Sequence, residues 1–140
     1  MKTKLFLLFY ILAIITLSTK AQSMTESEIL GVWKVAKIHI LNKIPPEQKQ
    51  TLELVTKAFL NSNFNFKKDK NFSFDIEFNE IKLKNKHWKL DKLTQSFIVQ
   101  DWKDKDKYKS KLMEITTRKD GNKILFNIVE SFLELEMIKE

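Results

Sequence analysis

The chain has 140 residues, a formal net charge of +7 at pH 7 and no cysteine. This length corresponds to a single domain, and the lack of cysteine excludes disulfides and a thiol nucleophile. Arg118 is the only arginine, and the lysines alternate with acidic and amide residues. Nucleic-acid readers favour arginine for bidentate contacts, so we expect no nucleic-acid partner and interpret the lysines as solvated turns and strand faces.

Residues 1–21 have the pattern of a secretory signal peptide. Lys2 and Lys4 precede an apolar run from Leu5 to Leu17, and a small residue lies two positions before Ala21. The run is shorter than the roughly 20 residues that span a bilayer. We predict cleavage after Ala21, a domain over 22–140 and a periplasmic or secreted location with no stable membrane anchor. A lipid anchor would require a cysteine at the cleavage point, and the chain has none. Cleavage would also remove three lysines, which lowers the positive charge of the mature protein.

The first elements of the domain are a strand and a helix. Residues 29–41 are rich in β-branched side chains that partly alternate with polar ones, which predicts a strand. Residues 46–61 predict the one good helix. Its first turn suits Pro46, and its apolar stripe consists of Leu52, Val55 and Phe59.

From residue 64 onward, apolar and polar side chains alternate with a period of two. Phenylalanines at 64, 66, 72, 74 and 78 share one face of a predicted hairpin. Further strands are predicted over 88–90, 96–102, 112–117, 124–129 and 132–138, with 81–83 as a weak continuation of the hairpin. A loop or long hairpin tip covers 101–109, and Asp120-Gly121 predicts a tight turn. About eight antiparallel strands favour an all-β, up-and-down barrel, because closure removes the sheet edges. The helix would plug or cap one end.

Three short motifs follow one another along the chain: Leu30-Gly31-Val32-Trp33-Lys34, the segment from Phe66 to Phe74, and His87-Trp88-Lys89-Leu90-Asp91. They resemble motifs of the lipocalin superfamily and of the lipocalin-like domain proteins exported by Bacteroidetes-type bacteria. The resemblance implies an eight-stranded barrel in which Gly31 and Trp33 are a structural signature, with the Trp33 ring across the closed end. It also implies a small apolar or amphipathic ligand inside the barrel.

Candidate ligand-lining residues are Trp88, Trp102 and Phe74, since aromatic side chains commonly line small-molecule pockets. The alternative is that these aromatics are core packing and that the domain is a non-enzymatic protein-interaction module with a solid barrel core. His39 and His87 are far apart in sequence, and no catalytic or metal-binding motif is present. Asp101, Asp104 and Asp106 imitate the start of a calcium loop but lack its glycine and distal glutamate. We therefore expect a monomer without enzymatic activity, metal or cofactor.

Overall fold

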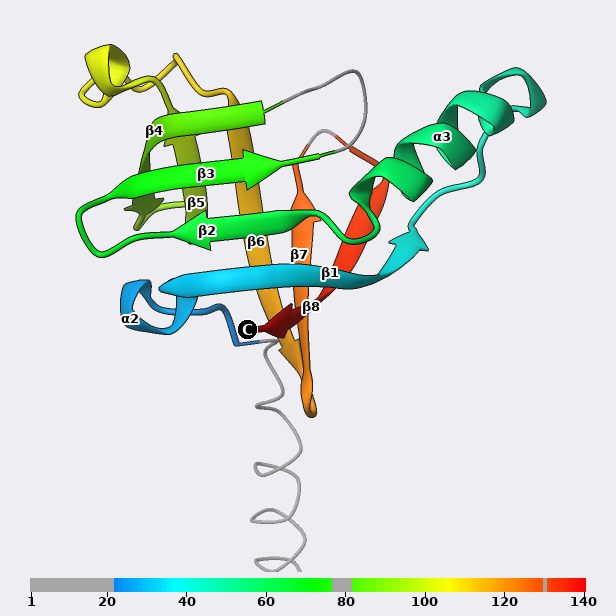
Figure 1. The fold of residues 1–140 in the computed structure, drawn as a ribbon, viewed down its shortest axis with the longest axis horizontal. Coiled ribbons are helices and arrows are strands. Elements are labelled where there is room, and N and C mark those ends of the chain that lie inside the picture. Colours follow the sequence, from blue (N-terminus) through cyan, green and yellow to red (C-terminus); the bar gives the residue numbers. More distant parts are fainter. Residues whose placement is uncertain (1–21, 77–81, 130) are drawn as a thin grey trace, which may run out of the picture.

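The computed structural model describes residues 22–76, 82–129 and 131–140, so the predicted signal peptide lies outside the described residues. Eight antiparallel strands pair in sequence order, and the last strand pairs with the first to close a barrel (Figure 1). This confirms the predicted fold class, with its helix after the first strand. The strands are β1 Gly31–Ile40, β2 Asn63–Phe66, β3 Asn71–Asp75, β4 Lys82–Asp91, β5 Ser96–Gln100, β6 Met113–Asp120, β7 Lys123–Ile128 and β8 Leu133–Lys139.

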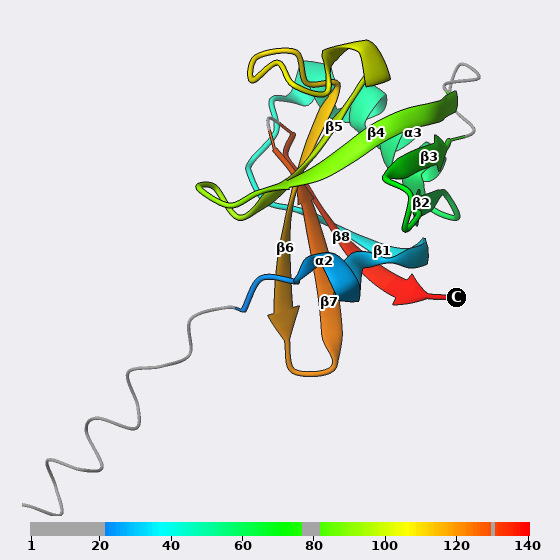
Figure 2. The same cartoon turned by 90° about the vertical axis from the view of Figure 1, so that its left-hand side faces the viewer.

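The two ends of the barrel carry different elements (Figure 2). At one end a short helix, α2 (Glu26–Ile29), precedes β1 and lies near the β6–β7 turn. At the other end lie α3 (Lys49–Phe59) and the loop between β5 and β6. We call these the α2 end and the α3 end.

The α2 helix seals its end of the barrel with side chains and polar contacts. Ile29 is fully buried, and the backbone N–H of Met24 donates to the Thr117 hydroxyl at 2.8 Å. Glu28 pairs with Lys119 beside the β6–β7 turn, and this contact with its bonds from Thr25 lowers the pKa of Glu28 to about 2. Thr25 and Glu28 also form a capping box, which satisfies the free donors of the first turn.

Several predicted boundaries shift. The predicted helix over 46–61 consists of a 3-10 turn, Pro46–Gln48, followed by α3, which ends at Phe59. The segments predicted at 81–83 and 88–90 belong to one ten-residue strand, β4. The strand predicted over 96–102 ends at Gln100, and a 3-10 turn starts at Trp102. The predicted strand residue Phe78 lies outside the described residues.

The predicted tight turn is confirmed. Asp120 pairs with Lys123 across a two-residue connection, and Gly121 has φ +58°. An L-amino acid with a side chain enters this region of φ only at a cost, so glycine suits the position.

Candidate functional site

Aromatic side chains fill the barrel interior towards the α2 end. The Phe66 ring lies 4.9 Å from Phe72, 5.7 Å from Trp88, 6.1 Å from Phe97 and 6.3 Å from Phe126, measured between ring centroids. All five side chains are at most 1% exposed. Rings at these separations form a continuous packed cluster, so side chains fill the interior of this half of the barrel.

The three predicted ligand-lining residues lie in three different places. Trp88 is fully buried in the aromatic cluster, and its indole N–H donates to the Lys67 carbonyl at 2.9 Å. Trp102 is 39% exposed on the outer surface, where its indole N–H donates to Asn71. Phe74 is buried towards the α3 end, 4.5 Å from Phe64. The structure therefore does not bring the three together around one pocket.

Gly31 and Trp33 adjoin α2. Gly31 has φ +122°, a conformation that residues with a Cβ rarely adopt. Trp33 is buried, and its indole N–H donates to the carbonyl of Ile29 at 2.7 Å. Trp33 thus ties the start of β1 to the last residue of α2.

The α3 end is packed less completely than the α2 end. Of the α3 side chains only Ala58 is buried, although Leu52, Val55 and Phe59 form the apolar face. Figure 1 shows the N-terminal part of α3 extending away from the barrel. The apolar face of the helix is therefore only partly covered by the strands.

Two apolar clefts lie along α3 and share Leu52 and Ile44. The first has a volume of about 270 Å³, and the second has a volume of about 340 Å³. Val55, Phe132 and Leu133 contribute to the first. The second is lined by Ile40, Asn42, Ile44, Lys49, Leu52, Glu53 and Thr56. A smaller cleft of about 150 Å³ lies beside Phe59 and Met113. The apolar stripe of the predicted helix contains Leu52 and Val55. The sequence pattern does not show that clefts lie between these side chains and the ends of β1 and β8.

The histidines lie on separate, non-adjacent strands. The His39 Nε2 lies 3.2 Å from a Glu136 carboxylate oxygen, and this contact holds the pKa of Glu136 below its usual value. Burial lowers the pKa of His87, whose ring packs against Trp102 with centroids 4.8 Å apart. No group of three or more histidine, aspartate or glutamate side chains in the described part of the chain is placed to hold a metal ion.

Asp101 and Asp104, from the calcium-like run, both pair with lysines. Lys86 contacts Asp101 at 2.6 Å, and Lys107 contacts Asp104 at 2.9 Å. The first pair attaches the start of the β5–β6 loop to β4, and the second lies within the loop.

Over residues 22–76, 82–129 and 131–140, no helix has the length and apolar character needed to cross a bilayer. No protein-family model, no curated protein and no solved structure matches this chain.

Proposed function

We propose that this protein is an exported, non-enzymatic binding protein that holds a small apolar or amphipathic ligand at the α3 end of its barrel. The observation that carries the proposal is the pair of apolar clefts along α3, which meet at Leu52 and Ile44. Small-molecule sites are concave and mostly apolar, commonly about 300–1,000 Å³ in volume, with a few polar groups that orient the ligand. Two adjoining clefts along one helix suit an elongated ligand such as an acyl chain.

The position of the ligand differs from that in a hollow barrel. Phe66, Trp88 and Phe97 are packed against one another in the α2 half. Placing a ligand there would require these rings to move apart and lose their contacts. Along α3, by contrast, a ligand would cover apolar surface of Leu52 and Val55 that the strands leave partly exposed.

The rim of the larger cleft carries one charge of each sign. Lys49, at the start of α3, and Glu53 line the same cleft as Leu52. The ammonium group of Lys49 can pair with the anionic head of a ligand whose apolar tail lies along the cleft. This arrangement supports an amphipathic ligand such as a fatty acid.

Two leucines of α3 provide a matched test. Leu52 lines both clefts, whereas Leu54 is 51% exposed and lines neither. Binding of a fluorescent fatty-acid analogue should weaken about ten-fold or more in Leu52→Asn, because a buried leucine contact is worth about 1.5–3 kcal/mol. Leu54→Asn should bind as the native protein does.

If both variants bind the analogue as tightly as the native protein does, the α3 clefts are not its binding site. Ligand binding itself would be rejected by two results together. The native protein would not bind the fluorescent fatty-acid analogue, and native mass spectrometry of protein from its own host would show no copurifying lipid. Sequencing the N-terminus of that protein tests export, since cleavage after Ala21 leaves Gln22 as the first residue.

The alternative function is a non-enzymatic protein-interaction module with a solid barrel core. The packed α2 half and the exposed apolar side chains at the α3 end favour it. Ile40, Leu41 and Phe132 are each 48% exposed, and clustered exposed apolar side chains are typical of interaction surfaces. Native mass spectrometry separates the two functions, since a protein partner would appear in place of a small ligand.

A further inference from the structure

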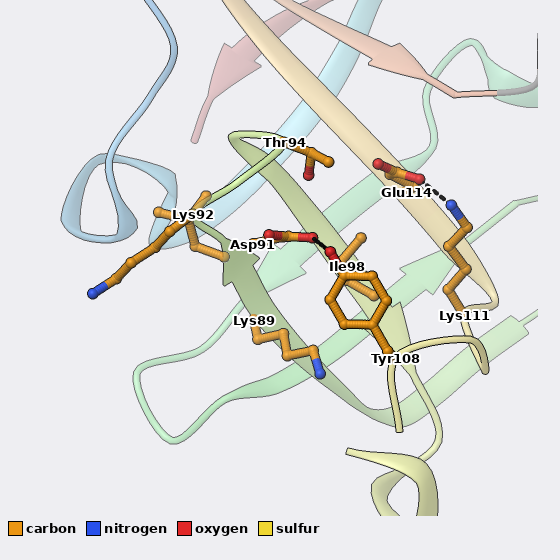
Figure 3. Close-up of a pocket in the computed structure, with 9 residues that line it drawn as sticks. Lys89, Asp91, Lys92, Thr94, Ile98, Tyr108, Lys111 and Glu114 are labelled. Atoms are coloured by element: carbon orange, nitrogen blue, oxygen red, sulfur yellow. Dashed lines mark hydrogen bonds and ion pairs between the residues drawn. The ribbon is translucent and has the colours of Figure 1, made fainter. Parts of the chain in front are cut away.

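A further groove lies on the outer face of the barrel, away from the α3 clefts (Figure 3). It has a volume of about 290 Å³, and its floor crosses three paired strands. Lys89 of β4 pairs with Ile98 of β5, which pairs in turn with Glu114 of β6. Because inward and outward residues alternate along a strand, these three side chains point outward together. Asp91, Lys92, Tyr108 and Lys111 also line the groove.

The β5–β6 loop, residues 101–112, forms one wall of this groove and is held in place by Gln100. The Gln100 side chain is 1% exposed. Its amide nitrogen lies 2.7 Å from the carbonyl of Asp104, 3.1 Å from that of Lys107 and 3.3 Å from that of Ser110. Lys89 adds a bond to the Lys105 carbonyl at 2.8 Å. The loop is therefore already fixed to β4 and β5. A ligand that binds in the groove loses less binding free energy, because the loop does not have to be ordered on binding.

Tyr108 projects from this loop and presents its ring to solvent. The side chain is 70% exposed, yet its hydroxyl donates to Asp91 at 3.0 Å. Figure 3 shows this bond joining the loop to the end of β4. An aromatic face that is both exposed and held in one orientation is a stacking platform, since C–H groups are attracted to its negative face.

The charged groups of the groove offer donors and acceptors in fixed positions. Asp91 also accepts the backbone N–H of Leu93, and Glu114 pairs with Lys111 and accepts the Ser96 hydroxyl. These bonds lower the pKa of both Asp91 and Glu114, so both carboxylates are ionised at neutral pH. The lining carries three lysines and two acidic residues, an excess of one positive charge.

We propose that this groove binds an acidic monosaccharide, a hexuronate. A pyranose ring has a C–H face that stacks on Tyr108, and its hydroxyls hydrogen-bond to carboxylates and lysines. Figure 3 shows the exposed Lys92 side chain extending away from Tyr108 at the rim of the groove. The carboxylate of the sugar complements the positive excess and pairs with the Lys92 ammonium, whose flexible four-carbon stem turns towards the ligand. A purely apolar ligand would cover these charged groups without hydrogen-bonding to them, which costs free energy, and a bare anion would make no contact with the Tyr108 ring. The inference is independent of the proposed function at the α3 clefts.

The test is an amide NMR titration of the protein with glucuronate, glucose and acetate. Glucuronate should give saturable shifts in Asp91, Ile98 and Tyr108, with glucose weaker and acetate without effect. Tyr108→Ala should weaken glucuronate binding by about three- to ten-fold, the value of an aromatic contact. Lys92→Gln should weaken glucuronate about two- to five-fold, as expected for an exposed ion pair, and leave glucose binding unchanged.

Two further variants are controls, one for the folding of the loop and one for non-specific binding to exposed aromatic side chains. Tyr108→Phe keeps the ring, so it should retain more affinity than Tyr108→Ala. Phe132→Ala removes another exposed aromatic, at the α3 end, and should leave glucuronate binding unchanged. Absence of saturable shifts with glucuronate, equal binding of acetate, or full affinity in Tyr108→Ala would each overturn the proposal.

Discussion

Replacing Phe66 by alanine tests whether the α2 half of the barrel is solid. Phe66 is 1% exposed, and its ring contacts four other aromatic side chains. A buried Phe→Ala change costs about 3–5 kcal/mol, because apolar contacts are lost and a cavity remains. We expect a loss of about 4 kcal/mol, since ring partners fixed on β3, β4, β5 and β7 cannot easily close the gap.

Urea denaturation measures this loss in the free energy of unfolding. Native stability is commonly only about 5–15 kcal/mol, so Phe66→Leu serves as a milder variant if the alanine protein does not fold. Leu54→Ala is the control, because a change at this exposed site should alter stability by no more than about 0.5 kcal/mol. Benzene should raise the melting temperature of Phe66→Ala more than that of the native protein, because both proteins keep the α3 clefts and only the variant has the added cavity. A loss below about 1.5 kcal/mol, or an equal rise with benzene in both proteins, would refute the packed interior.

Three further predictions concern the contacts that hold α2, the start of β1 and the β5–β6 loop. Glu28→Gln should lower the free energy of unfolding by about 1 kcal/mol at pH 7, a value reduced by solvent screening because Glu28 is 39% exposed. The pKa of Glu28 is lowered in the folded state, so its contribution is present above about pH 4.5 and is lost as the pH falls towards 2. A difference in unfolding free energy that stays constant from pH 7 to pH 2 would contradict this assignment. Gly31→Ala should cost about 1–3 kcal/mol through backbone strain at φ +122°, and an unchanged melting temperature would argue against that strain. Gln100→Leu should speed amide hydrogen exchange across residues 101–112, because three backbone carbonyls lose their shared donor. Unchanged exchange there would show that other contacts hold the loop.

The strand pattern was predictable because one face of most strands is buried. The alternation around Phe64, Phe66, Phe72 and Phe74 predicted the β2–β3 hairpin, and the structure pairs Phe64 with Phe74 and Phe66 with Phe72. The Asp-Gly turn was equally clear, since Gly121 adopts the positive φ that it requires. These features depend on local sequence alone.

Features that depend on contacts between distant segments were not predictable. Every residue of β5 is buried, because the loop after Gln100 folds back over its outer face. The long strand β4 contains Asn85 at φ +53°, and apolar and polar residues alternate poorly along it, so the sequence pattern predicts two short segments in place of one strand. The short helix α2 lies next to the predicted signal peptide and has no apolar periodicity.

The candidate sites were predictable only in part. The helical stripe identified Leu52 and Val55, but the clefts also need Ile40 and Phe132 from the ends of β1 and β8. Trp88 and Trp102 are both candidate ligand-lining residues by their aromatic character, yet the sequence does not distinguish the fully buried indole from the exposed one. Their surroundings are set by the Lys67 carbonyl and by Asn71, which lie on other segments of the fold.

Methyl NMR during titration with dodecanoate tests the proposed ligand site most directly. We expect saturable shifts in the methyl groups of Leu52, Val55 and Leu133, which line the α3 clefts. We expect none in the methyl groups of Val99 and Leu135, which are fully buried in the core. Shifts centred on Val99 and Leu135 would place the ligand inside the barrel and contradict the account. The absence of any saturable shift would contradict it as well.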